Sequence, residues 1–195
     1  MLAGKGFKHV YNLSGGIKSW EKEIAIGPED LGMELFVSDL SPHEAIVVGF
    51  GLEEGLRDYY LQMQLRVKTQ EAKVLFGMLA DIETVHQEML VTLYSSVTGK
   101  TVTVDDFSAM IAQPVMEGGL TTADYLNRYS VDFSSELEIL SFALAIEAQA
   151  LDLYQRAAAK STIEGTQKVL GKIAEEEREH IARLGQYIDQ QKEFK

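Results

Sequence analysis

The chain contains no cysteine among its 195 residues. Disulfide bonds, thiolate zinc sites, iron–sulfur clusters and a cysteine nucleophile are therefore excluded within it. Proline is also rare, with three residues, and this favours long uninterrupted helices. No apolar run is long enough to cross a bilayer, and the first residues do not have the pattern of a secretory signal peptide. We therefore predict a cytoplasmic protein with no membrane partner.

Positive charge is scarce as well. The sequence has 18 Lys and Arg against 30 Asp and Glu, which gives a formal net charge of −12. Because binding to phosphate backbones needs a basic face, we predict no nucleic-acid partner. An acidic surface could attract metal cations, although such surfaces commonly serve only to keep a protein in solution.

Apolar residues make up 46% of the chain, which suits a packed and mostly helical globule. From Ser41 onward the pattern is that of long helices. Ser41-Pro42-His43-Glu44 combines a capping box with proline at the first helical position, and Ser135 to Glu138 and Ser161 to Glu164 are interpreted as further capping boxes. The predicted helices lie near 42–67, 70–97, 136–160 and 162–191.

About 35 residues separate the second and third predicted helices, and they include Pro114, Gly118 and Gly119. A connection of this length can run along a bundle and bring the third helix parallel to the second. Short helices are expected within it around Asp105–Ala112 and Thr122–Tyr129. The sequence thus predicts an all-α four-helix bundle with a long crossover, covering residues 41–192.

An internal repeat relates the two halves of this bundle. A shift of 94 positions superimposes several polar residues and their apolar surroundings. The matching pairs are Ser41 and Ser135, Glu53 and Glu147, Asp58 and Asp152, Tyr60 and Tyr154, Glu83 and Glu177, and His86 and His180. Each half is therefore a helical hairpin with one Glu on its first helix and Glu-x-x-His on its second.

Six of these polar residues lie within apolar stripes spaced three and four apart, the spacing of one helix face. The stripes are Ile46, Phe50, Glu53, Leu56, Tyr60 and Met63; Leu75, Leu79, Glu83, His86, Leu90 and Leu93; Leu137, Leu140, Leu144, Glu147, Leu151 and Tyr154; and Val169, Ile173, Glu177, His180, Leu184 and Tyr187. We therefore expect Glu53, Glu83, His86, Glu147, Glu177 and His180 to face the core.

Buried ionised carboxylates are costly unless they are paired or bind a metal. Two divalent cations would balance the charge of four carboxylates, and an i, i+3 Glu and His can reach the same ion. A single Glu-x-x-His is a weak signal, but two copies with identical spacing that face inward predict a carboxylate-bridged site for two metals. His9 and His43 have no such neighbours and are interpreted as surface residues.

The segment from Ser41 to Gln191 resembles the rubrerythrin branch of the ferritin-like di-iron carboxylate proteins. The likeness rests on Ala145-Ile146-Glu147 with Asp152-Leu153-Tyr154, on Ala174 to His180, and on their counterparts in the first half. It implies a ferritin-like bundle with two iron ions as cofactors, although manganese, cobalt or zinc could occupy the same ligands. Tyr60 and Tyr154 would donate hydrogen bonds to the carboxylates, or else serve only as aromatic core.

Two features differ from that family. Rubrerythrins typically carry another Glu three residues after the ligand on the third helix, where this chain has Ala150. Family members with a four-cysteine rubredoxin domain receive electrons through it, and this chain has no cysteine. The resemblance therefore implies a separate electron-donor protein.

The start of the chain is of another kind. The stretch from Leu2 to Trp20 resembles the last part of a rhodanese domain, and we assign residues 1–28 to such a remnant. The reactive cysteine of a rhodanese lies upstream of this part, so we expect no sulfurtransferase activity. The hypothesis is that the remnant docks on its own bundle or on a neighbouring subunit of a homo-oligomer, expected to be a dimer.

The resulting functional prediction is a non-haem di-iron oxidoreductase of the peroxidase or ferroxidase type that reduces peroxide or O₂. Two alternatives stay open. One is ferritin-like binding and oxidation of iron, and the other is a structural metal-binding adaptor linked to rhodanese sulfur transfer.

Overall fold

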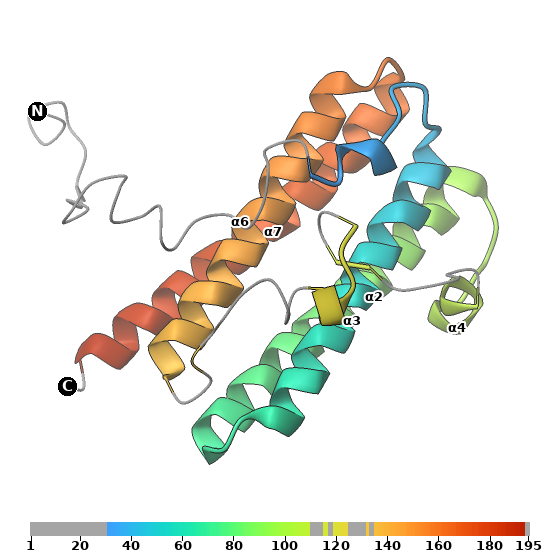
Figure 1. Ribbon diagram of the computed structural model, residues 1–195. Helices are drawn as coiled ribbons and strands as arrows, with labels where there is room; N and C mark the ends of the chain where they lie inside the picture. Colours follow the sequence, from blue (N-terminus) through green and yellow to red (C-terminus); the bar gives the residue numbers. More distant parts are fainter. Residues whose placement is uncertain (1–30, 110–114, 117–118, 125–131, 133–134, 194–195) are drawn as a thin grey trace, which may run out of the picture.

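A computed structural model describes residues 31–109, 115–116, 119–124, 132 and 135–193. Its long helices are α2 (Pro42–Arg66), α3 (Gln70–Thr98), α6 (Glu136–Lys160) and α7 (Glu164–Glu193), with the shorter η2 (Met33–Leu35) and α4 (Val104–Ser108) beside them (Figure 1). The predicted all-α, ferritin-like four-helix bundle is confirmed. Residues 1–28, which were predicted to be a rhodanese remnant, lie outside the described residues. Among those residues, no helix has the length and apolar character that a membrane span requires.

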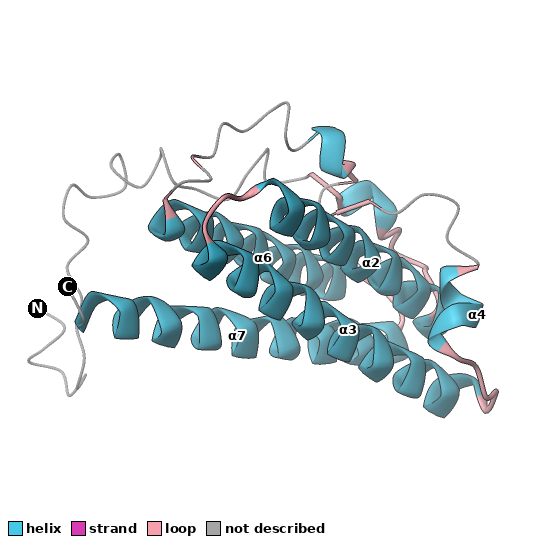
Figure 2. Cartoon of the chain, turned by 90° about the horizontal axis from the view of Figure 1, so that it is seen from below, coloured by secondary structure: helices cyan, strands magenta, loops and turns pink. Residues whose placement is uncertain are grey.

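The chain order produces two antiparallel hairpins. The first consists of α2 and α3, the second of α6 and α7, and α2 also packs on α7. Because α6 starts at the end of the bundle where α3 starts, these two helices run in the same direction (Figure 1). The crossover predicted between them is therefore present, and Figure 2 shows α4, which belongs to it, beside the first hairpin.

Local chemistry explains most helix ends. The backbone N–H of Ser41 donates to the Glu44 carboxylate over 2.9 Å, which completes the predicted capping box before Pro42. The chain leaves α3 through Gly99, whose φ of 71° is unfavourable for residues with a side chain. Short-range sequence signals were therefore sufficient to place both ends of the first hairpin.

The predicted capping box at Ser161 is wrong. Ser161 ends α6, since its N–H bonds to the Ala157 carbonyl over 3.0 Å, and α7 begins only at Glu164. The cause is a tertiary contact: the N–H and hydroxyl of Thr162 both donate to the Ser38 carbonyl, over 2.7 and 3.0 Å. At Ser135 only half of the predicted capping box forms. The Glu138 N–H lies 3.3 Å from the Ser135 hydroxyl, as expected for an N-cap. The Ser135 N–H, however, donates to the Asp132 carbonyl, and the Glu138 carboxylate accepts from the N–H of Asp132 instead.

The crossover is held against the first hairpin by aromatic packing. The ring of Phe107 in α4 is fully buried, and it lies 4.9 Å from the rings of both Phe50 and Tyr94. The first helix predicted here, Asp105–Ala112, corresponds to α4, which ends at Ser108, while residues 110–112 lie outside the described part. Of the second, Thr122–Tyr129, residues 122–124 are helical and the rest is not described.

Further along, the crossover touches the backbone of α2. A Cβ atom at Gly55 would lie 2.2 Å from the carbonyl oxygen of Val115, so only glycine allows this close approach. One turn on, the Thr122 hydroxyl donates to the Asp58 carboxylate over 3.2 Å. These contacts fasten the crossover along the outer side of α2.

The core consists of two apolar clusters, one toward each end of the bundle. One contains Leu56, Tyr60, Met63, Leu75, Leu79, Ile139, Ala143 and Leu184, and the other contains Ile46, Phe50, Leu90, Ala150, Tyr154, Val169 and Ile173. On every long helix the predicted polar residues fall between the part that enters one cluster and the part that enters the other. The packing of both clusters therefore fixes four helices around a polar layer.

Candidate metal centre

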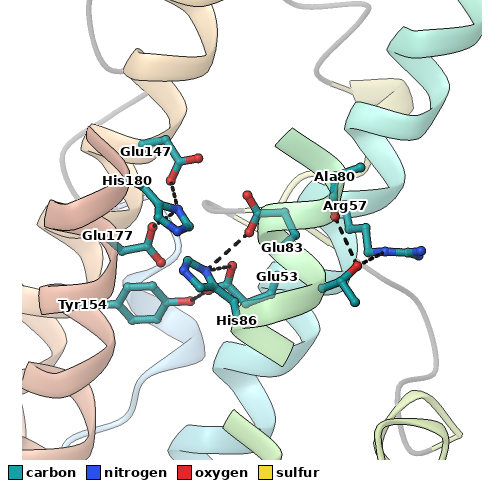
Figure 3. A network of polar contacts seen from close by, with 10 residues as sticks. Glu53, Arg57, Ala80, Glu83, His86, Glu147, Tyr154, Glu177 and His180 are labelled. Carbon is teal, nitrogen blue, oxygen red and sulfur yellow. Dashed lines mark hydrogen bonds and ion pairs between the residues drawn. The ribbon is translucent and has the colours of Figure 1, made fainter. Parts of the chain in front are cut away.

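Six polar side chains meet in this layer. They are Glu53 of α2, Glu83 and His86 of α3, Glu147 of α6, and Glu177 and His180 of α7, and none is more than 4% exposed. Figure 3 shows them pointing toward one another from both hairpins. The structure therefore brings together all six residues that the repeat singled out.

Each histidine lies between two carboxylates of its own hairpin. His86 Nδ1 is 3.2 Å from Glu53 Oε2 and 3.5 Å from Glu83 Oε2. His180 Nδ1 is 3.5 Å from Glu147 Oε2, and 4.0 Å from the carboxylate of Glu177. The internal repeat in the sequence is thus reproduced as a repeat in the geometry.

Several carboxylate oxygens and imidazole nitrogens of this layer lack a hydrogen-bond partner in the described structure. Among the described residues, the buried atoms without one include both carboxylate oxygens of Glu83, Glu147 Oε2, Glu177 Oε1, His86 Nε2 and His180 Nδ1. Leaving buried polar atoms without partners costs roughly 1–3 kcal/mol each. Cations would supply the missing partners, so the residues present fit a metal centre.

Three overlapping groups have the proximity that a metal ion requires, with ligand atoms within 4.8 Å of one another. The groups are Glu53, Glu83 and His86; Glu83, Glu147 and His180; and His86, Glu177 and His180. Glu83 and both histidines each occur in two groups. Shared residues of this kind suit two adjacent ions better than two independent sites.

Without a cation, several side chains of the layer have pKa values far from their usual ones. Burial acts to raise the pKa of Glu53, but the hydrogen bond and charge of His86 outweigh it and lower this pKa to about 2. For His86, burial acts to lower the pKa, but the hydrogen bond with Glu53 and the carboxylate of Glu83 3.5 Å away raise it to about 11. These two residues therefore form a buried ion pair.

The carboxyl groups of Glu83 and Glu177 have pKa values shifted in the opposite direction to that of Glu53. Burial and the nearby charge of Glu147 raise the pKa of Glu83 well above its usual value. Burial and the charges of Glu53 and Glu147 do the same for the pKa of Glu177. Carboxyl groups that resist ionisation here would ionise readily beside a cation, because the cation reverses the local electrostatics.

The two tyrosines predicted near the ligands are both fully buried. The Tyr154 hydroxyl donates to Glu53 Oε1 over 3.1 Å, so this tyrosine reaches across from α6 to α2. Tyr60 packs against the rings of Tyr59 and Phe76. A hydrogen bond from Tyr60 to a carboxylate stays a prediction.

One polar contact near the centre has no counterpart in the other half. Arg57 Nε donates to the Thr84 hydroxyl over 2.9 Å, and this hydroxyl donates to the Ala80 carbonyl over 3.2 Å. Figure 3 shows Arg57 on the side of the hairpin away from the six residues. At the repeat positions of Arg57 and Thr84 the second half has Leu151 and Arg178, so a comparison of the two halves could not find it.

Comparison with known proteins supports the same interpretation. Residues 138–194 match the family model described as Rubrerythrin. The match begins within α6, continues through α7, and covers less than half of the chain. No curated protein and no solved structure gave a significant match to the chain. The matched segment contains Glu147, Glu177 and His180, and also Ala150, which is buried three residues after Glu147 and is the position that differs from the family pattern.

Proposed function

We propose that the six residues hold two iron ions and that the protein is a non-haem di-iron oxidoreductase that reduces peroxide or O₂. The observation that carries this proposal is the set of buried Glu and His atoms that face one another without hydrogen-bond partners within the described structure. The rubrerythrin family match to the second hairpin supports it independently.

The donor set favours iron. Carboxylate oxygen and imidazole nitrogen suit iron and manganese, and the absence of cysteine removes the thiolates that select other metals. When bound, the two iron ions would supply the electrons for reduction. Four carboxylates and two divalent ions balance in charge, which would make the loaded layer less costly to bury than the metal-free one.

The chain's own residues would orient and shield this centre. The Tyr154 hydroxyl and the His86 ring hold the two oxygens of Glu53, and so fix the direction of its carboxylate. The two apolar clusters exclude water from both ends. Reduction of peroxide also consumes electrons from outside, and we propose a separate electron-donor protein because the chain has no cysteine for an iron–sulfur centre of its own.

The test is an anaerobic titration with two Fe(II) per chain, followed by mixing with peroxide or with air while near-UV absorption is recorded. Rapid oxidation by either oxidant that a reductant reverses, with repeated turnover, is expected. Glu53→Ala and Glu147→Ala should lose the two-iron stoichiometry, whereas Glu54→Gln, which changes the carboxylate next in the chain to Glu53, should keep it.

Other outcomes would identify the alternatives. Slow oxidation of Fe(II) far beyond two equivalents, with the iron retained, would favour ferritin-like storage. Binding that raises the melting temperature while oxidants leave the absorption unchanged would favour a structural metal and would overturn the redox proposal.

A further inference from the structure

The outer side of α3 carries an apolar stripe. Among the six large apolar side chains that are exposed in the described structure, three share this helix face: Val74 at 52%, Met78 at 49% and Val85 at 62%. Ile82 and Met89, each partly buried, fall on the same face by spacing. We call these five residues the α3 stripe. Apolar residues that are exposed singly need no explanation, but exposed apolar residues gathered along one helix face indicate an interaction site.

The second hairpin provides an internal control. The repeat maps the α3 stripe onto α7, and the residues there are Lys168, Lys172, Glu176, Glu179 and Arg183. Three of them form ion pairs along the helix: Lys168 pairs with Glu164, and Arg183 pairs with Glu179. Because both hairpins carry the same metal-ligand pattern, the centre does not require the apolar residues on α3. The α7 face is suited to water, and the α3 face is suited to a partner.

The spacing of the stripe indicates what that partner is. Val74, Met78, Val85 and Met89 are separated by steps of four, seven and four, which read the same in both directions. An identical helix laid antiparallel, with a twofold axis between Asp81 and Ile82, would place Val74 opposite Met89 and Met78 opposite Val85. Self-complementarity of this type is what a twofold homodimer requires.

Charges on one edge of the stripe fit the same arrangement. Thr84 lies three residues after Asp81, on the same side of α3, and Thr84 holds the partly buried Arg57. Neither Arg57 nor the exposed Asp81 makes an ion pair within the described part of the chain. In the antiparallel pair, Asp81 of the second copy lies within one helical turn of Thr84, where it can meet Arg57.

We propose that the α3 stripe is the interface with a second copy of this chain, paired antiparallel about an axis between Asp81 and Ile82. The two metal centres of such a dimer lie one behind each α3. This inference stands apart from the proposed redox function, because it rests on the outer face of α3 rather than on the ligands.

The first test is the mass of the full chain in solution by light scattering. The wild type should have twice the mass of one chain. Met78→Lys together with Val85→Glu places on α3 the residues that α7 carries, and this variant should be monomeric with unchanged helix content and unchanged metal binding. Val37→Glu, at an equally exposed apolar residue outside α3, should stay dimeric.

Two outcomes would overturn the proposal. One is a monomeric wild type, as expected if the N-terminal segment covers the stripe. The other is a dimer that both variants leave intact.

The second test measures the register and uses the absence of cysteine. With the axis between residues 81 and 82, Ile82→Cys should form an intermolecular disulfide on oxidation. Val74→Cys should not pair with its own copy, since 15 residues of helix separate the two positions by roughly 22 Å along the axis. Efficient crosslinking through Val74→Cys, or none through Ile82→Cys, would exclude the antiparallel arrangement.

Discussion

The imidazole rings of His86 and His180 stack in the middle of the bundle, with centroids 3.8 Å apart and planes 5° from parallel. The two residues are 94 positions apart in the chain and come from different hairpins. Their contact means that the two copies of Glu-x-x-His form one centre. The centre can therefore assemble only when the two hairpins pack together, which couples metal binding to the tertiary fold.

Glu83 should be needed for both ions, because its carboxylate belongs to two of the three candidate ligand groups. We expect Glu83→Gln to bind fewer than two equivalents of Co(II) or Fe(II), with at least a tenfold loss of affinity for the first equivalent. A metal titration with elemental analysis of the dialysed protein measures both. Glu88→Gln, at an exposed position of the same helix, is the control and should match the wild type.

The same substitution should stabilise the metal-free protein. Burial and the charge of Glu147 raise the pKa of Glu83, so the folded state holds a proton that the unfolded chain releases above its ordinary pKa near 4.5. Stability therefore falls as the pH rises above that value, and Gln removes this loss. We expect the melting temperature of metal-free Glu83→Gln to exceed that of the wild type at pH 8, by about 2–4 °C for each kcal/mol gained. The difference should shrink toward pH 4, and a variant that melts lower at pH 8 would contradict the electrostatic account.

Metal binding should release protons. Without a cation the raised pKa values of Glu83 and Glu177 favour their neutral forms, and His86, with a pKa of about 11, is protonated at neutral pH. Coordination requires deprotonated ligands, so the apparent affinity should rise with pH. Calorimetry of Co(II) binding in two buffers of different ionisation enthalpy gives the number of protons released. Equal heats in both buffers would show that the ligands were already deprotonated.

Much of the centre could be predicted because it leaves a periodic record in the sequence. Glu53 and His86 are polar residues inside apolar stripes, and their copies at Glu147 and His180 make coincidence improbable. The same method could not find Arg57 with Thr84, because that contact occurs in one half only. Nor could it place the start of α7, which depends on a hydrogen bond from Thr162 to Ser38, more than a hundred residues earlier in the chain.

Tyr154 should position Glu53 rather than bind metal itself. Its hydroxyl is the donor to Glu53 Oε1, and the ring packs on Phe36 with centroids 5.9 Å apart. Tyr154→Phe keeps the ring and removes the hydrogen bond, so we expect a loss of roughly 10–100-fold in metal affinity with a small change in stability. Tyr59→Phe, at a buried tyrosine outside the repeat, is the matched control. Equal effects of the two substitutions would show that Tyr154 is aromatic core only.

Any side chain at Gly55 should destabilise the protein, because the crossover lies close to the backbone of α2 at this position. A Cβ atom there would lie 2.2 Å from the Val115 carbonyl oxygen and 2.9 Å from the Met116 nitrogen, and both are backbone atoms that cannot rotate away. We expect Gly55→Ala to lower the free energy of unfolding by roughly 1–3 kcal/mol, despite the higher helix propensity of alanine.

Gly171 in α7 is the matched control, because a Cβ atom there meets nothing within 4 Å. Gly171→Ala should stabilise the protein by about 1 kcal/mol, since only the helix propensity changes. Denaturant unfolding of the metal-free forms measures both differences. If both substitutions stabilise the protein to the same extent, the crossover does not press on α2 in solution.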